Sequence, residues 1–277
     1  MKLLVNYGNE YFRESQAKNS ATGREVGGFD EVASFGPDDI DADFRAKHKQ
    51  TLSHFRGNGY WLWKPYFIYR TLADLASGDF LFYCDSGAYF TAAIDPLVEV
   101  CLRDRQDVIP FDNRLPEKTW TKRDAFVLLD CDRPEITDTT QRLASFTLIR
   151  KSPFSLAFVR EWLIAAEDPR ILTDLKNTQG LPNYPQFIDH RHDQSIFSLL
   201  TKKHGLAAYR NPSQNSKNFG AFPTSTYGTL IEHTRKRQLP LHLKLMREVQ
   251  TGWMKLRKML QGKPQFESGK RRRRRAA

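Results

Sequence analysis

The sequence has few cysteines, and it has no apolar run long enough to span a bilayer. Its three cysteines, Cys84, Cys101 and Cys131, are not spaced as metal ligands, so we expect no disulfide framework. The apolar run Leu3-Leu4-Val5 is too short for the core of a secretory signal. Together these absences favour a cytoplasmic chain in a reducing compartment.

Acidic residues are scarce in the last part of the chain. Residues 231–277 hold 15 Lys and Arg against 3 Asp and Glu, whereas residues 1–230 are nearly balanced at 28 against 29. The net charge of +11 is typical of a nucleic-acid binder, but the body is electrically neutral and the basicity belongs to an extension. The 277 residues, of which 40% are hydrophobic, are enough for one large domain with a buried core.

The basic extension has two parts. Residues 239–260 place apolar side chains at spacings of three and four, which predicts a basic amphipathic helix within 231–262. Such a helix either lies on an anionic membrane surface or packs on the body with its basic face in solvent. Residues 263–277 contain an unbroken cationic run, Lys270 to Arg275, and we expect them to be disordered. No aromatic interleaving accompanies the charge, so nucleic acid is not the partner we expect.

Strand-like and helix-like patterns alternate along residues 1–230, which we expect to form the catalytic domain. We expect strands at 2–7, 29–35, 79–83, 107–111 and 146–150, and helices at 41–55, 66–75, 95–104, 153–166 and 190–204. The stretch 8–28 is polar and rich in Gly, Ser and Asn. This alternation predicts an α/β domain with a largely parallel sheet.

Asp85 directly follows an apolar strand and is followed at once by Ser86-Gly87. Open α/β sheets bind ligands at the carboxyl ends of their strands, although Asp-Ser-Gly is also favourable turn chemistry. Lys64 lies at a helix start, where its charge opposes the helix dipole, and this position favours contact with an anion. Trp61 is either a packing residue or a platform for a sugar or base.

Two further polar clusters are candidates for function. Residues 120–124, Trp-Thr-Lys-Arg-Asp, are either an exposed loop or a site in which Lys122 or Arg123 binds phosphate and Asp124 binds an acceptor hydroxyl. Residues 190–195 open a helix, and Asp193 is either its cap or a functional carboxylate.

Three segments resemble GT-A-type glycosyltransferases, most closely bacterial and viral proteins described as probable glycosyltransferases. They are Gly-Tyr-Trp-Leu-Trp-Lys-Pro at 59–65, the pattern GDxLxYxDxG at 78–87, and His-Asp-Gln-Ser at 192–195. The resemblance covers roughly residues 1–220. It implies a GT-A-like, Rossmann-type sandwich and a hexosyltransferase that moves sugar from a nucleotide-sugar to an acceptor hydroxyl, with inversion or retention left open.

The resemblance also implies a divalent cation, Mn²⁺ or Mg²⁺, that bridges the donor diphosphate. Gly87 stands where the second aspartate of a DxD motif is expected, so Asp85 needs a partner, either His192 or Asp193. Alternatively the enzyme is metal-independent, and the cationic side chains of Lys64, Lys122 and Arg123 neutralise the diphosphate. The implied metal ligands are Asp85 and His192, and the implied catalytic carboxylates are Asp193 and Asp124. The implied donor-binding residues are Trp61, Lys64, Asp85, Ser86, Gly87, Lys122, Arg123 and Gln194.

The basic extension fits an enzyme that is peripheral on the inner face of a membrane. A glycan or lipid-linked acceptor, as in cell-surface polysaccharide biosynthesis, is therefore the partner we expect beside the donor. Two other functions stay open: a nucleic-acid- or phosphate-binding protein that works through the basic tail, and a metal-dependent hydrolase that uses Asp85 and His192.

Overall fold

A computed structural model of the protein describes residues 1–216, 221–234 and 252. The chain divides into two units, residues 1–239 and 240–277. The predicted amphipathic helix and polybasic tail lie outside the described residues, apart from 252. Within the described part of the chain, no helix is long and apolar enough to cross a membrane.

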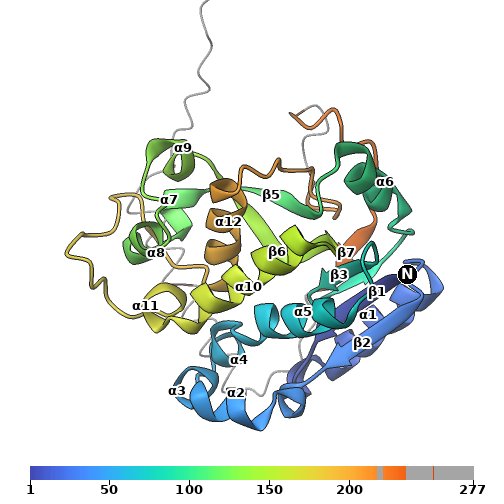
Figure 1. Ribbon diagram of the computed structural model, residues 1–277, viewed down its shortest axis with the longest axis horizontal. Helices are drawn as coiled ribbons and strands as arrows, with labels where there is room; N and C mark the ends of the chain where they lie inside the picture. The colour runs from blue at the N-terminus through green and yellow to red at the C-terminus, as the bar shows by residue number, and fades with distance from the viewer. Residues whose placement is uncertain (217–220, 235–251, 253–277) are drawn as a thin grey trace, which may run out of the picture. The chain divides into compact units, whose positions relative to one another are not determined.

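The described unit is built from short strands and helices in alternation (Figure 1). The strands are β1 Lys2–Tyr7, β2 Glu31–Phe35, β3 Phe80–Cys84, β4 Ala88–Phe90, β5 Val108–Pro116, β6 Thr140–Arg150 and β7 Ile231–His233. The helices are η1 Glu10–Phe12, α1 Arg13–Glu25, η2 Pro37–Asp39, α2 Ala42–Lys47, α3 Lys49–Leu52, α4 Gly57–Tyr60, α5 Trp63–Asp74, α6 Asp95–Asp104, α7 Glu117–Trp120, α8 Arg123–Leu128, α9 Pro134–Thr137, α10 Pro153–Glu167, α11 Pro169–Leu172 and α12 Asp193–Lys203.

Five strands form the central sheet in the order β2-β1-β3-β6-β5. Strand β1 pairs in parallel with β2 and β3, whereas β6 is antiparallel to both β3 and β5. Strand β5 therefore runs in the same direction as β1, β2 and β3, and only β6 is reversed in this sheet. The predicted α/β fold with a mostly parallel central sheet is confirmed.

Each face of the sheet has its own hydrophobic core, because side chains alternate along a strand. Leu3 and Val5 belong to the core that contains α5, α10 and α12, and Figure 1 shows these three helices running across one face. Leu4 and Phe82 belong to the other core, which contains α6 and the small β4-β7 sheet. Helix α1 covers this second face, where Gly23 lies against Leu4. The sheet is thus the middle layer of a sandwich.

Most of the predicted elements are present, and the largest omission is α1. The prediction described residues 8–28 only as a polar stretch, but Arg13–Glu25 are helical. The helix is polar even on its buried side, where Asn19, Ser20 and Gly23 face inward. Asn19 accepts a hydrogen bond from Asn6 and donates one to the Ala88 carbonyl. Hydrogen bonds to the sheet replace the apolar stripe by which helices are predicted.

Two predicted boundaries need correction. The single helix expected at 41–55 is two short helices, α2 and α3, that meet at His48, and Phe55 is 61% exposed. The catalytic domain was predicted to end at residue 230, yet Ile231–His233 form β7, which pairs with β4. Backbone hydrogen bonds thus hold the first residues of the predicted extension in the body.

Candidate functional site

Asp85 lies at the carboxyl edge of the central sheet, immediately after β3. Its backbone N–H donates to the Ser145 carbonyl at 2.7 Å, and its own carbonyl accepts from Ala88 N–H at 3.0 Å. The next residue, Ser86, donates its hydroxyl to the Tyr7 carbonyl at the end of β1. These bonds tie the Asp-Ser-Gly turn to the neighbouring strands, so the Asp85 side chain projects from a fixed backbone at the sheet edge.

The Lys64 ammonium lies between two carboxylates. Its Nζ is 2.7 Å from Asp193 Oδ2 and 3.3 Å from Asp85 Oδ1, and it donates a hydrogen bond of 3.0 Å to the Ala144 carbonyl. The Tyr83 hydroxyl donates to the same Asp85 oxygen at 2.7 Å. Side-chain exposure is 3% for Lys64 and 5% for Asp193 but 33% for Asp85. Asp85 is therefore the member of the cluster that a ligand can reach, through its Oδ2.

A turn with strained backbone directly precedes helix α5, which contains Lys64. Asn58, Tyr60 and Trp61 all have positive φ angles, which are uncommon for residues other than glycine. The Trp63 ring stacks on Tyr7 with ring centroids 3.7 Å apart, and this contact fixes the start of α5 against the end of β1. Lys64 follows directly as the second residue of α5, and its Nζ lies 3.3 Å from Asp85 Oδ1. Strained backbone of this kind is concentrated at functional sites.

Asp193 reaches the cluster from the first residue of α12. The preceding residue, His192, has φ 50° and ψ −120°, a conformation that costs a non-glycine residue free energy. The Trp162 indole donates to the Asp193 carbonyl at 3.2 Å, and this bond fixes the backbone from the neighbouring helix α10. The helix start therefore aims the carboxylate at Lys64.

The pKa values of Asp193, Lys64 and Tyr83 are shifted by burial and by the charges of neighbouring groups in the cluster. Burial raises the pKa of Asp193 to about 6, with Lys64 opposing this shift and Asp85 adding to it. Burial alone would lower the pKa of Lys64, but the two carboxylates outweigh it and the net shift is upward. Burial together with Asp85 raises the pKa of the Tyr83 hydroxyl, so Tyr83 stays a hydrogen-bond donor. Lys64 is thus charged over the whole neutral pH range.

A hollow of about 650 Å³ lies at the same edge of the sheet. It is lined by Gly8 to Tyr11, Arg13 and Gln16 after β1, by Gly36 to Asp38 after β2, and by Leu52 to Phe55 and Asn58. The Asn58 amide donates to the Tyr7 hydroxyl, and Tyr7 in turn bonds Ser86 through its carbonyl. The hollow is thereby connected to the Asp85 turn, and its volume is typical of small-molecule sites.

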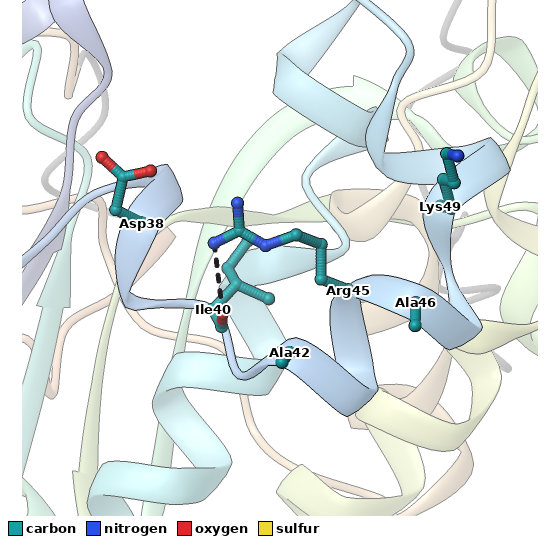
Figure 2. A pocket seen from close by; sticks show the side chains of 6 residues that line it. All are labelled: Asp38, Ile40, Ala42, Arg45, Ala46 and Lys49. Carbon is teal, nitrogen blue, oxygen red and sulfur yellow. Dashed lines mark hydrogen bonds between the residues drawn. The ribbon is translucent and has the colours of Figure 1, made fainter.

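A second hollow, of about 510 Å³, lies on the outer side of η2 and α2 (Figure 2). Its polar lining is Asp38, Arg45 and Lys49, and Figure 2 shows the Arg45 guanidinium turned back to the Ile40 carbonyl. None of the predicted site residues lines either hollow, but the first hollow is joined to the Asp85 turn through Tyr7. We therefore do not treat this second hollow as the functional site.

The predicted pairing of Asp85 with His192 as metal ligands is not what the structure shows. His192 Nδ1 lies 2.8 Å from the Leu172 carbonyl, and Nε2 is 3.9 Å from Asp174. The ring stacks on Trp61, with centroids 5.6 Å apart. The backbone conformation of His192 directs its side chain away from the carboxylate that follows it. Trp61, predicted to bind the donor, is this stacking partner.

The residues predicted at 122–124 hold a loop and lie apart from the Lys64 cluster. Lys122 is buried and donates to the Leu175 and Thr173 carbonyls, and Arg123 is paired with Asp132. The Asp124 carboxylate accepts hydrogen bonds from the backbone of Thr178 and Gln179 and from the Thr178 hydroxyl. These contacts replace the predicted phosphate and acceptor contacts, because the segment after α11 folds over all three side chains.

Three other predicted donor-binding residues have structural contacts as well. Ser86 uses its hydroxyl on Tyr7, as described above, and the Gln194 amide donates to the Gln141 side-chain oxygen at 2.8 Å. The Gly87 carbonyl accepts a hydrogen bond of 2.8 Å from Thr234 N–H. A Cβ placed on Gly87 would meet nothing within 4 Å, so an aspartate would fit there, and its absence is not dictated by packing.

Sequence reasoning missed several residues of the site. Tyr83 binds Asp85 directly, and its signal was present, since the pattern at 78–87 contains a tyrosine two residues before the aspartate. Asn9, His54 and Asn58 line the hollow of about 650 Å³, which is the main hollow. Asn9 follows the first strand, where a ligand-facing loop is expected, but nothing in the sequence indicates that residues 54 and 58 fold back to it.

Gly59, in the strained turn, has no room for a side chain. Its φ is 94°, and an added Cβ would lie 2.8 Å from Leu52 Cα. We expect Gly59→Ala to lower the free energy of unfolding by about 2–4 kcal/mol, through positive-φ strain and overpacking. Gly180→Ala is the matched control, because Gly180 also has a positive φ but a Cβ there meets nothing within 4 Å. Urea unfolding that gives equal losses for both variants would contradict this reading.

Comparisons with known proteins assign no family to the chain. No family model and no curated protein matches the sequence. The solved structures that align with it include the WbbM bifunctional glycosyltransferase without ligand (TM-score 0.49, 11% identity, 84% of this chain), mouse xyloside xylosyltransferase 1 without ligand (0.45, 10%, 87%), and the galactosyltransferase LgtC with donor and acceptor sugar analogs (0.47, 12%, 92%). The alignments cover 45%, 100% and 96% of those proteins. All three TM-scores are below 0.5, so the likeness assigns neither activity nor substrate to this chain.

Proposed function

We propose that this protein is a glycosyltransferase of the hexosyltransferase type, which transfers a sugar from a nucleotide-sugar donor to an acceptor hydroxyl. The observation that carries the proposal is the convergence of three sequence motifs on one ammonium group. Lys64 belongs to the motif at 59–65, Asp85 to that at 78–87 and Asp193 to that at 192–195. Carboxylate oxygens of Asp85 and Asp193 both lie within 3.3 Å of Lys64 Nζ. Buried charge clusters at the carboxyl edge of an α/β sheet are characteristic of functional sites.

The donor nucleotide is assigned to the main hollow, between the loops that follow β1 and β2. This hollow is lined by the aromatic rings of Tyr11, His54 and Phe55, which can stack on a base, and by amide groups of Asn9 and Asn58. The donor sugar then extends toward Asp85, because Tyr7 and Ser86 connect the hollow to that turn.

Asp85 is the carboxylate that meets the substrate. Lys64 and Tyr83 both bind its Oδ1, so its Oδ2 is the oxygen left to accept hydrogen bonds from donor hydroxyls. Asp193 and Asp124, predicted as catalytic, are nearly or fully buried. We assign Asp193 to positioning Lys64, and through it Asp85, whereas Asp124 holds the loop that contains Thr178.

The acceptor is proposed to be a glycan or a lipid-linked glycan at the cytoplasmic face of a membrane. The support is the basic sequence that follows β7, with 15 Lys and Arg in residues 231–277. The start of this sequence is fixed at the site, since Thr234 donates to the Gly87 carbonyl.

A thermal-shift screen tests the proposed donor. UDP-, GDP-, CMP- and dTDP-linked sugars are added to the full chain, with EDTA and separately with Mn²⁺. A donor at about one hundred times its dissociation constant adds about 2.7 kcal/mol of stability, which corresponds to a rise of about 5 °C or more in Tm. We expect at least one donor to produce this rise and Asp85→Ala to remove it.

The second hollow provides the matched control for the donor screen. Lys49 lines that hollow and not the main one, so Lys49→Ala should keep the full donor-dependent rise. If no nucleotide-sugar stabilises the wild type, or if Lys49→Ala and Asp85→Ala act alike, the proposed function is wrong.

A further inference from the structure

A positive charge already lies between the two carboxylates where a donor-site metal is expected. Lys64 Nζ is 2.7 Å from Asp193 and 3.3 Å from Asp85, and its side chain is 3% exposed. An ammonium group has three N–H donors, and the Ala144 carbonyl at 3.0 Å provides the third acceptor. Three protein oxygens, two of them from carboxylates, therefore lie within 3.3 Å of the ammonium nitrogen.

The residues present do not fit a divalent cation at this position. Mg²⁺ needs oxygen ligands at about 2.0–2.1 Å in octahedral geometry, and like charge opposes its approach to a buried ammonium. Gly87 offers no second carboxylate on the turn, and His192 faces Leu172 and Asp174. Within residues 1–216 and 221–234, no group of three or more His, Cys, Asp or Glu side chains is arranged to hold a metal ion.

We propose that the Lys64 ammonium is the resident cation of this site and that Asp85 and Asp193 bind no divalent metal while it is present. The inference deepens the proposed function, on which it rests for the identity of the substrate, by making donor binding independent of Mn²⁺ and Mg²⁺. The upward shift of the Lys64 pKa agrees with it, since the ammonium keeps its charge at neutral pH.

The position of Lys64 in the fold explains why it is not simply displaced. The stacked pair Trp63 and Tyr7 fixes the backbone next to Lys64, and the Lys64 Nζ also lies over the Tyr83 ring, 5.1 Å from its centroid. Moving the ammonium out would remove the counter-charge that it provides to two carboxylates, one of them nearly buried. A metal would have to replace all of these contacts at once.

Binding of Mn²⁺ to the full chain, followed by electron paramagnetic resonance of the free ion, tests the proposal without any donor. We expect wild type and Asp85→Asn to bind Mn²⁺ equally weakly, because Asp85 is not a ligand in either. Wild-type binding that Asp85→Asn weakens would overturn the proposal. This comparison decides the question even where a Lys64 variant does not fold.

Removing the resident cation provides the second arm of the experiment. Lys64→Met leaves Asp85 and Asp193 free, so we expect Mn²⁺ affinity to rise on the order of tenfold or more, because a repelling charge within a few ångströms is gone. The gain should disappear in the double variant Lys64→Met with Asp85→Asn. A folded Lys64→Met protein that binds Mn²⁺ no better than wild type would also overturn the proposal.

The outcome for the metal is separable from the outcome for the sugar donor. A donor-induced rise in Tm that is the same in EDTA and in Mn²⁺ supports both proposals. A rise seen only with Mn²⁺ keeps the glycosyltransferase and overturns the role of Lys64 as resident cation. With no rise under either condition, the glycosyltransferase proposal fails, and the Mn²⁺ binding experiment still decides whether Lys64 excludes a metal.

Discussion

Lys64→Met is expected to lower the free energy of unfolding by about 3–5 kcal/mol near neutral pH, the range measured when one partner of a buried ion pair is removed. The substitution leaves the Asp193 carboxylate buried without the ammonium that pairs with it, since Lys64 Nζ lies 2.7 Å from Asp193 Oδ2. It also removes a charge from beside Asp85 and a donor from the Ala144 carbonyl. Urea unfolding at about pH 7.5 measures the loss.

The loss should shrink in acid, and the sign follows from Asp193. Burial raises its pKa from 3.8 to about 6 in the folded protein, so the folded state binds more protons than the unfolded state between these values. Stability linked to this group therefore increases as pH falls through about 6. Without Lys64, burying the ionised Asp193 carboxylate costs more free energy than it does in wild type. The variant should therefore gain more stability than wild type when the pH falls from about 7.5 to about 5.

A surface lysine serves as the control for this stability prediction. Lys47 pairs with Glu167, and its side chain is 64% exposed. Lys47→Met should cost at most about 1 kcal/mol, because exposed ion pairs contribute little. The prediction is wrong if Lys64→Met lowers the free energy of unfolding no more than Lys47→Met does. It is also wrong if the decrease caused by Lys64→Met does not change with pH.

The sequence alone was a good guide to the fold where the apolar pattern is clear. Strand β1 and helix α6 have the predicted bounds, because Leu3-Leu4-Val5 are the short apolar run of a strand buried on both faces, and the apolar residues of α6 repeat as a helix requires. Helix α1 escaped prediction because it packs through Asn19 and Ser20, whose hydrogen-bond partners lie in strands β1 and β4. A polar helix of this kind has no periodic signal to find.

The site was predictable as a set of segments but not as a set of contacts. The three motifs indicated Asp85, Lys64 and Asp193, and the fold brings these residues together. The directions of side chains depend on backbone conformations, such as φ 50° at His192, that no residue-type pattern specifies. His192 was therefore assigned to Asp85 although it faces Trp61. Likewise, Lys122 was taken for a phosphate ligand because the covering segment near Leu175 was not foreseen.

Asp193→Asn is expected to reduce the rate of sugar transfer about a hundredfold, the effect of a displacement of about 1 Å in a site where orientation matters. The carboxamide has no charge to hold Lys64, so the ammonium turns toward Asp85 and moves the one exposed carboxylate. Donor affinity should change far less than the maximal rate, because the main hollow is untouched. Steady-state kinetics with the donor found in the thermal-shift screen would show a fall in kcat with KM nearly constant.

The pH profile separates this positioning role from a purely structural one. In wild type, transfer should fall as pH drops below about 6, because Asp193 with its raised pKa takes up a proton and releases Lys64. Asp193→Asn is neutral at every pH, so its low rate should lack that acid limb. Asp124→Asn is the matched control: its carboxylate holds the Thr178 loop, so the acid limb near pH 6 should remain. An acid limb that persists in Asp193→Asn and vanishes in Asp124→Asn would exchange the roles of the two aspartates and return Asp124 to the catalytic assignment that the sequence first suggested.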